Sequence, residues 1–395
     1  MKIKIVQKQR LEYIIVIFIL MFCINVTSSI FRVSFYYWIP LVLDICGILI
    51  YSLQKSKRIK LKFIYYDMIK QFFLPLLIPS MLAAVTSAAV YHNSRFTLSS
   101  FKYVLWVYGA YLLGYFLIQR YKFKAFYLVV IAGTISYITV IIKALYFKEL
   151  GYLEVHELTY IYGMLFIFFM LYKGISKKRK IGLCLVCFIG VYLGGKRALW
   201  LAMAIALAIY ILFYKILKNK TLGLRCVAFG LICVAFIWVW FIKAGYFEMT
   251  CMRFGINDMS RLKMWNYFRN DYEMSLGYLG RGLTYTDVVM SDIHSLLHIS
   301  TAIPIHNCIL KMYIGWGFVP FAYYLYAFLY KRVLYMTKKG AKNNAWLFLA
   351  ITIVFYIINF LGDTLFNMGI SIVYAMIWTL LQNKDNLEIG KGIAL

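Results

Sequence analysis

Stretches of about 20 apolar residues recur along almost the whole chain, and they constrain its fold more than any other feature. A helix of this length crosses a bilayer, and within lipid only helices and closed barrels satisfy the backbone polar groups. We therefore predict an all-α polytopic membrane protein with about 12 transmembrane helices. The predicted segments are 11–31, 36–53, 72–91, 101–119, 126–147, 157–172, 181–194, 198–217, 224–242, 308–330, 345–361 and 364–381.

The composition agrees with this class of protein. Apolar residues make up 63% of the 395 residues, which is more than the core of a soluble protein requires. The net charge of +28 would suit a nucleic-acid partner if the cations formed one patch. Lys and Arg are instead spread over alternate loops, so they are expected to set orientation in the membrane, and no nucleic acid is expected as a partner.

Cationic runs indicate which loops are cytoplasmic. Residues 55–60 and 177–180 are rich in Lys and Arg, which are retained on the inner side of a membrane and suit anionic lipid headgroups. Both termini are then predicted to lie in the cytoplasm, with the chain in the cytoplasmic (inner) membrane. The apolar stretch from Leu11 has no convincing cleavage site and is followed by further spans, which favours an uncleaved first helix.

Residues 243–305 form the only sizeable polar segment, and the predicted orientation makes it extracytoplasmic. Ser260 is expected to cap a helix there, with an apolar face that lies on the membrane or on the transmembrane bundle. That face comprises Leu262, Trp265, Phe268 and Tyr272, and the glycines that then break regular structure are Gly277, Gly280 and Gly282. Without a linker or an internal repeat, residues 1–395 are expected to form a single integral domain.

The segment 194–197, with the sequence Gly-Gly-Lys-Arg, is expected to form a tight outer turn. Glycine lets a ligand approach the backbone closely, and the helix predicted to begin near Ala198 points its first amides at the same place. With Lys196 and Arg197 they predict a site for a lipid-linked phosphate or pyrophosphate. The alternative is that both side chains reach lipid headgroups.

Arg261 precedes Trp265 by one helical turn, so both can share a face. The arginine is a candidate phosphate ligand, while the indole would pack on the membrane or stack on a sugar. The alternative is that Arg261 pairs with Asp258 or faces water. Arg281 is a further candidate for substrate contact. The alternative is that its charge lies in a loop and is solvated by water.

His306 is the one ionisable residue at the start of its predicted span. Imidazole titrates near neutrality, so it is suited to take a proton from an attacking hydroxyl. Asn307 is expected to orient this imidazole or to bind substrate. The alternative is a structural histidine at the membrane boundary.

The sequence gives little support to metal or cofactor chemistry. His294 and His298 have the spacing of a helical metal pair, but no third ligand follows, so neither metal nor cofactor is predicted. No outer Asp-x-Asp motif and no Walker loop is present. Asp44 and Asp363 are the few acids near predicted spans, a scarcity that disfavours an ion-coupled carrier.

The cysteines do not form a recognisable framework. Cys184 and Cys187 form a CxxC inside a predicted span, where a redox role is disfavoured. Cys251 and Cys308 both fall on the predicted outer side, so a disulfide between them remains open. The sequence alone does not decide whether they pair.

Taken in order, these motifs resemble the O-antigen ligase and O-antigen polymerase superfamily of bacterial polysaccharide enzymes. The resemblance covers roughly residues 181–381. The sequence departs from the family pattern at Lys196, where many relatives have Ser. The motifs that carry it are the Gly-x-x-Arg turn 194–197, Ser260-Arg261-Leu262 with Trp265, the glycines of the loop, His306-Asn307, Leu310 and Gly315-Trp316-Gly317.

The resemblance implies a GT-C-like fold and a metal-independent glycosyltransferase that uses glycans carried on undecaprenyl pyrophosphate. Arg197 and Arg261, with Lys196 beside them, would then hold the pyrophosphate, and His306 would activate the acceptor hydroxyl. Asn307, Trp265 and Arg281 are secondary candidates for substrate binding.

The reading we favour is a polysaccharide polymerase for O-antigen or capsule repeats, which joins one lipid-linked glycan to the next lipid-linked repeat unit. Its expected partners are the lipid-linked oligosaccharide, membrane lipids and a chain-length regulator. The nearest alternative is a ligase that uses lipid A core or another acceptor. An alternative of another class is a lipid-linked glycan flippase or transporter.

Overall fold

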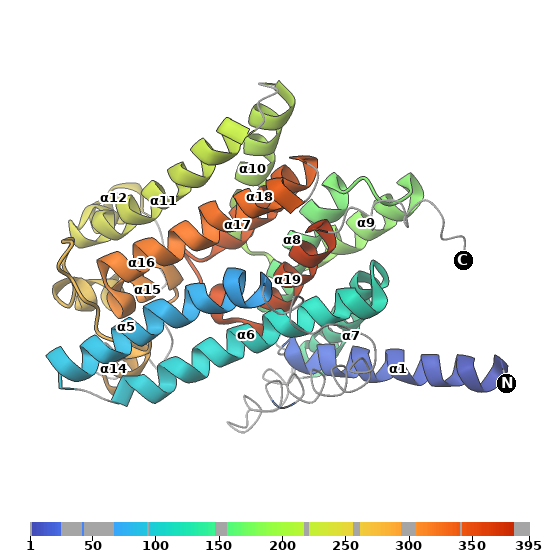
Figure 1. The fold of residues 1–395 in the computed structure, drawn as a ribbon, viewed down its shortest axis with the longest axis horizontal. Helices are drawn as coiled ribbons and strands as arrows, with labels where there is room; N and C mark the ends of the chain where they lie inside the picture. Colours follow the sequence, from blue (N-terminus) through green and yellow to red (C-terminus); the bar gives the residue numbers. More distant parts are fainter. Residues whose placement is uncertain are drawn as a thin grey trace.

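The computed structural model describes residues 2–24, 42, 67–92, 95–146, 156–216, 221–255, 261–293, 305–339 and 342–382. Within these residues every regular element is a helix and no strand occurs (Figure 1), which confirms the all-α prediction. Apart from residue 42, the expected span 36–53, with Asp44, lies outside the described residues.

Helices occupy each of the other predicted spans, with boundaries that differ by a few residues. Their bounds are α1 (Lys2–Cys23), η2 (Ile69–Phe73), α5 (Leu74–Val90), α6 (Arg95–Tyr121), α7 (Lys124–Tyr146), α8 (His156–Leu171), α9 (Lys177–Gly194), α10 (Arg197–Ile209), η3 (Tyr210–Ile216), α11 (Thr221–Lys243), α15 (Cys308–Trp316), α16 (Phe318–Leu325), η5 (Tyr326–Lys331), α17 (Arg332–Lys339), α18 (Lys342–Ile358) and α19 (Met368–Gln382).

Several of these helices have the length and composition needed to cross a membrane. Among the described residues, the 4 stretches that meet both conditions are Ile69–Val90, Lys124–Tyr146, Arg197–Tyr214 and Thr221–Lys243. Shorter apolar helices cover Leu158–Leu171, Asn343–Ile358 and Met368–Gln382. These apolar helices indicate a membrane protein, while the count of about 12 crossings stays a prediction.

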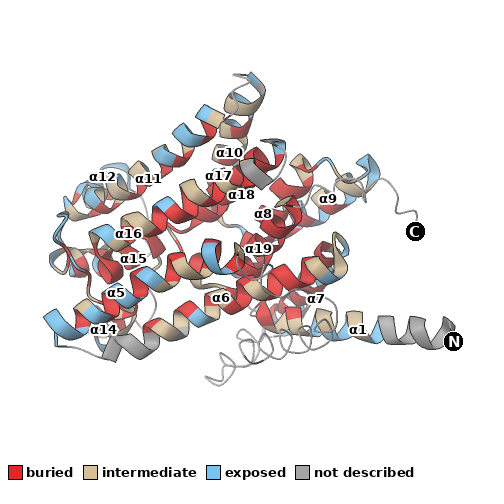
Figure 2. Ribbon diagram, in the orientation of Figure 1, coloured by how far each residue is buried: buried red, intermediate tan, exposed pale blue. Residues whose placement is uncertain are grey.

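The centre of the bundle is buried, and its periphery includes many exposed residues (Figure 2). The side chains of α19 are buried from Met368 to Leu381. By contrast α7, α9 and α11 expose large apolar side chains, such as Ile142, Leu185 and Phe229. Water disfavours such a surface, whereas acyl chains match it, so these helices are suited to face lipid.

The described part of the polar segment 243–305 contains three short α-helices and lies at one end of the bundle, opposite the start of α1 (Figure 1). They are α12 (Tyr246–Phe254), α13 (Arg261–Tyr267), which continues into the 3-10 turn η4 (Phe268–Asn270), and α14 (Tyr285–Ile293). Residues 256–260 and 294–304, with Ser260, His294 and His298, lie outside the described residues.

The apolar face of α13 packs on the helix bundle. Of the two predicted locations for this face, the membrane and the bundle, the structure therefore shows the second. The ring of Trp265 lies 5.9 Å from that of Trp238 in α11. Farther along, the hydroxyl of Tyr272 donates a hydrogen bond to the carbonyl of Val239 at 3.3 Å. The loop is therefore fixed to α11 by its own buried aromatic residues.

The glycines predicted to break regular structure bring the backbone at 280–282 into contact with the backbone at the end of α15. Arg281 and Gly282 donate amide hydrogen bonds to the carbonyls of Ile314 and Gly315, both at 2.9 Å. A Cβ atom on Gly280 would lie 2.4 Å from the nitrogen of Gly317, and no flexible side chain is there to yield. Glycine thus allows the polar segment 243–305 to contact the helix that begins beside His306.

We expect Gly280→Ala and Gly315→Ala each to destabilise the protein by about 1–3 kcal/mol, because an added methyl group meets backbone. At Gly315 the added Cβ would lie 2.7 Å from the Cα of Leu283, and Gly280 also has φ +77°. Thermal denaturation of the full chain in detergent micelles measures the effect. Gly277→Ala is the matched control, since a Cβ there meets open space. Equal melting temperatures for all three variants would refute this packing.

Candidate functional site

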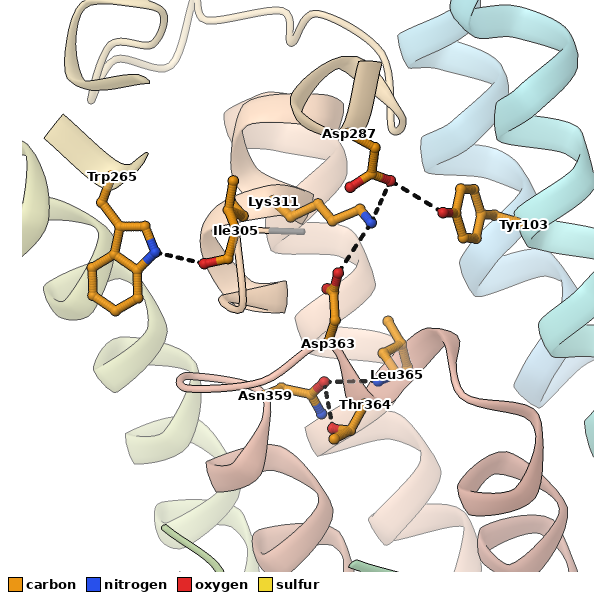
Figure 3. Close-up of polar contacts among 9 residues, drawn as sticks. All are labelled: Tyr103, Trp265, Asp287, Ile305, Lys311, Asn359, Asp363, Thr364 and Leu365. Carbon is orange, nitrogen blue, oxygen red and sulfur yellow. Dashed lines mark hydrogen bonds and ion pairs between the residues drawn. The ribbon is translucent and has the colours of Figure 1, made fainter. Parts of the chain in front are cut away.

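His306 lies in a short segment whose backbone is held by hydrogen bonds both before and after this residue. On one side, the indole nitrogen of Trp265 donates a 2.7 Å hydrogen bond to the carbonyl of Ile305 (Figure 3). On the other, the amide of Cys308 donates to the carbonyl of Gly362 in the turn between α18 and α19, at 3.1 Å. His306 itself has φ +49°, a left-handed conformation that few residue types favour. Anchors from α13 and from the α18–α19 turn therefore hold this backbone in place.

Asn307 has a structural role and an unused donor. Its side-chain oxygen accepts a 3.0 Å hydrogen bond from the amide of Leu310, so it is the N-cap of α15. The residue is 0% exposed, and among the described residues its Nδ2 atom has no hydrogen-bond partner. A buried amide that caps a helix and keeps a free donor beside His306 is suited to contact a bound polar group.

The surroundings of His306 favour its neutral form. Burial lowers the pKa of the imidazole below its usual 6.5, and the positive charges of Arg261, Lys196 and Lys311 lower this pKa further. The negative charge of Asp363 acts in the opposite direction and raises it. At neutral pH the imidazole is therefore unprotonated and able to accept a proton.

Two of the cations singled out from the sequence come from distant elements and act on the same imidazole. Lys196 is the N-cap residue of α10, after Gly195 in the left-handed conformation with φ +58°. Arg261 begins α13, and its buried Nε has no partner among the described residues. Arg197, the first residue of α10, is exposed. The positive charges of Lys196 and Arg261 thus affect the pKa of His306, whereas the role of Arg197 stays a prediction from the motif.

Trp265 and Arg281 occupy positions that differ from the expected substrate contacts. The ring of Trp265 is 0% exposed and packs 4.8 Å from that of Phe247, so neither face is open to a sugar. Arg281 donates from Nε to the carbonyl of Asp271 at 2.6 Å, with its guanidinium 4.9 Å from the ring centre of Tyr91. Trp265 therefore positions the backbone before His306, and Arg281 links two parts of the polar segment 243–305.

A charged cluster that the sequence did not single out lies beside this site (Figure 3). The ammonium of Lys311, in α15, is 2.6 Å from Asp287 and 3.3 Å from Asp363. The hydroxyl of Tyr103, in α6, donates to the same oxygen of Asp287 at 3.1 Å. The available signal was a lysine within a predicted apolar span, because ionisable residues at such positions are rare and are usually paired.

Several buried polar atoms in and around this region have no partner among the described residues. They are Nε of Arg261, Nδ2 of Asn307, Oδ1 of Asp287 and Oδ1 of Asp363. Burying such atoms without hydrogen bonds is unfavourable, so they are expected to bind water or ligand. Two donors and two carboxylate acceptors would suit a ligand that carries both anionic groups and hydroxyls.

The described histidines and cysteines form neither a metal-ligating cluster nor a disulfide. No group of three metal-ligating side chains occurs within the described residues, and His294 and His298 lie outside them. Cys251 and Cys308 are both free and buried, so the disulfide left open by the sequence is not formed here. Cys184 and Cys187 are likewise free thiols.

Comparison of the chain with protein-family models, with curated proteins and with solved structures returns no match. The resemblance to the O-antigen enzymes therefore depends on short motifs and their order. Any function has to be argued from the residues gathered around His306.

Proposed function

We propose that this protein is a polysaccharide polymerase with a GT-C-like fold of about 12 spans in the cytoplasmic membrane. It would transfer a glycan from undecaprenyl pyrophosphate to a hydroxyl of the next lipid-linked repeat unit. The observation that carries the proposal is the half-buried imidazole of His306 just before α15, whose pKa is lowered by burial and by the positive charges of Arg261 and Lys196. A base close to cationic side chains is what a transfer from a pyrophosphate donor requires.

In this mechanism His306 takes the proton of the acceptor hydroxyl as its oxygen attacks the anomeric carbon of the donor glycan. The bond from that carbon to the pyrophosphate oxygen breaks, and the pyrophosphate keeps the electron pair. Lys196 and Arg261 stabilise the charge that develops on it, and the motif assigns the same role to Arg197. The negative charge of Asp363 favours the imidazolium that forms.

The deciding experiment incubates the purified protein with a defined lipid-linked oligosaccharide. Longer glycans with released undecaprenyl pyrophosphate are the expected products. Transfer that requires lipid A core would identify a ligase, and movement across liposomes without a new bond would identify a flippase. Repeating the assay with a chelator tests the expectation that no metal is needed.

We also expect the pH profile to follow the charges around His306. The base is active when neutral, so the rate should fall as the pH drops through the pKa of His306, which lies below 6.5. Lys196→Gln or Arg261→Gln removes a positive charge that lowers this pKa, so it should rise. The acidic limb of the rate profile of either variant should then move to higher pH. An unchanged limb in both variants would show that His306 does not titrate in the reaction.

A further inference from the structure

Lys311 is an internal lysine shared by two carboxylates. It is 1% exposed, although a charged group loses much of its solvation when it leaves water. Asp287 comes from α14 in the outer loop, and Asp363 comes from the turn between α18 and α19. One ammonium thus joins two distant segments and compensates only one of two negative charges.

The two ion pairs are unequal. Lys311 is 2.6 Å from Oδ2 of Asp287, which also accepts the hydrogen bond from Tyr103. Its distance to Oδ2 of Asp363 is 3.3 Å, and the other oxygen of Asp363 has no partner among the described residues (Figure 3). The positive charge is therefore drawn toward Asp287, which leaves Asp363 with more of its own negative charge.

The segment that carries Asp363 lies beside the segment that carries His306, because the amide of Cys308 donates a hydrogen bond to the carbonyl of Gly362 at 3.1 Å. The charged groups that shift the pKa of this imidazole include Asp363 from the α18–α19 turn, Arg261 from α13, Lys196 from the turn before α10 and Lys311 from α15. Among these four groups Asp363 is the only anion. Whatever controls the charge of Asp363 therefore controls how readily His306 holds a proton.

We propose that Lys311 is a positioning residue that divides its positive charge between Asp287 and Asp363 and so sets the negative charge that Asp363 presents to His306. The inference rests on the proposed function, in which His306 must be neutral before the reaction and protonated after it. It assigns the control of that balance to a lysine that touches neither substrate nor reacting atoms.

Two variants separate the division of charge from the total charge. In Asp287→Asn, Lys311 is left with Asp363 as its only anionic partner, so less negative charge reaches His306 and its pKa should fall. In the double variant Lys311→Met with Asp287→Asn, Asp363 has no cation, so the pKa of His306 should rise. The double variant keeps the wild-type net charge of the cluster, because one cation and one anion are removed together. It also avoids leaving Asp287 buried and unpaired, which would threaten folding.

The pH dependence of carbethoxylation by diethyl pyrocarbonate measures these shifts, because the reagent attacks neutral imidazole. Mass spectrometry of the peptide that carries His306 gives the midpoint for this residue in the intact protein. We expect the midpoint to move down in Asp287→Asn and up in the double variant, each by roughly one pH unit. Exposed His92 is the internal control and should keep one midpoint in every protein.

The outcomes keep the inference apart from the proposed function. Identical midpoints at His306 in all three proteins would overturn the role of Lys311 even if the wild type makes polymer. Opposite shifts with no glycan transfer by the wild type would support the charge division and refute the polymerase. A midpoint at His306 in Lys311→Arg equal to that of the wild type would further support an electrostatic role, because arginine keeps the positive charge.

Discussion

His306→Asn is expected to reduce glycan transfer by about 100- to 10,000-fold, because a positioned general base contributes an acceleration of that order. Asparagine is the informative substitution, since His306 has φ +49° and asparagine adopts this conformation more readily than alanine does. The backbone that is anchored at Ile305 and Cys308 should then keep its path. Single-turnover assays with a labelled lipid-linked oligosaccharide measure the rate of the chemical step.

A second variant separates loss of the base from loss of structure. His306→Gly also tolerates the positive φ and leaves room for a small molecule. Added imidazole should restore part of the transfer rate in His306→Gly and none in His306→Asn. The matched control is His92→Asn, which replaces another histidine with positive φ, at 50°, and should keep the wild-type rate. Normal polymer yield from His306→Asn would remove this residue as the base.

The positions of the apolar helices follow from the sequence because lipid imposes a simple rule. The span predicted at 224–242 is observed as α11, Thr221–Lys243, and the span at 126–147 as α7, Lys124–Tyr146. Length and apolarity are local properties, so they can be read without knowledge of the neighbouring helices. Which helices lie at the centre is not local. The complete burial of α19 depends on what surrounds it.

The site was predictable only in part, for the same reason. His306 and Lys196 stand at the ends of apolar segments, where a charged residue attracts attention, and Arg261 precedes Trp265 by one helical turn in the polar segment. The pairing of Lys311 with Asp363 joins residues 52 positions apart and gives no local pattern. For Trp265 the sequence was informative only locally. Its spacing predicts that it belongs to an apolar face, but not that α11 packs against that face.

Arg261→Gln is the second variant with a large expected effect, a loss of about 100- to 1,000-fold in transfer rate, because it removes a donor from the developing pyrophosphate charge. Lys263→Gln is the matched control on α13, since Lys263 is exposed two residues farther along. It should leave the rate unchanged within twofold. Arg261→Lys should fall between them, because an ammonium keeps the charge but cannot form a bidentate contact with phosphate. Equal losses for the variants at positions 261 and 263 would refute a specific contact.

The same assay decides which cation of the turn before α10 contacts the pyrophosphate. The motif assigns this role to Arg197, whereas the electrostatics of His306 single out Lys196. The two residues are adjacent, but Lys196 precedes the helix in extended backbone while Arg197 is its first residue, so their side chains leave in different directions. If Lys196 is the ligand, Lys196→Gln should lose about 100- to 1,000-fold in rate and Arg197→Gln far less. A larger loss in Arg197→Gln than in Lys196→Gln would mean that Arg197 binds the pyrophosphate of the donor. Lys196 would then act on His306 through its charge alone.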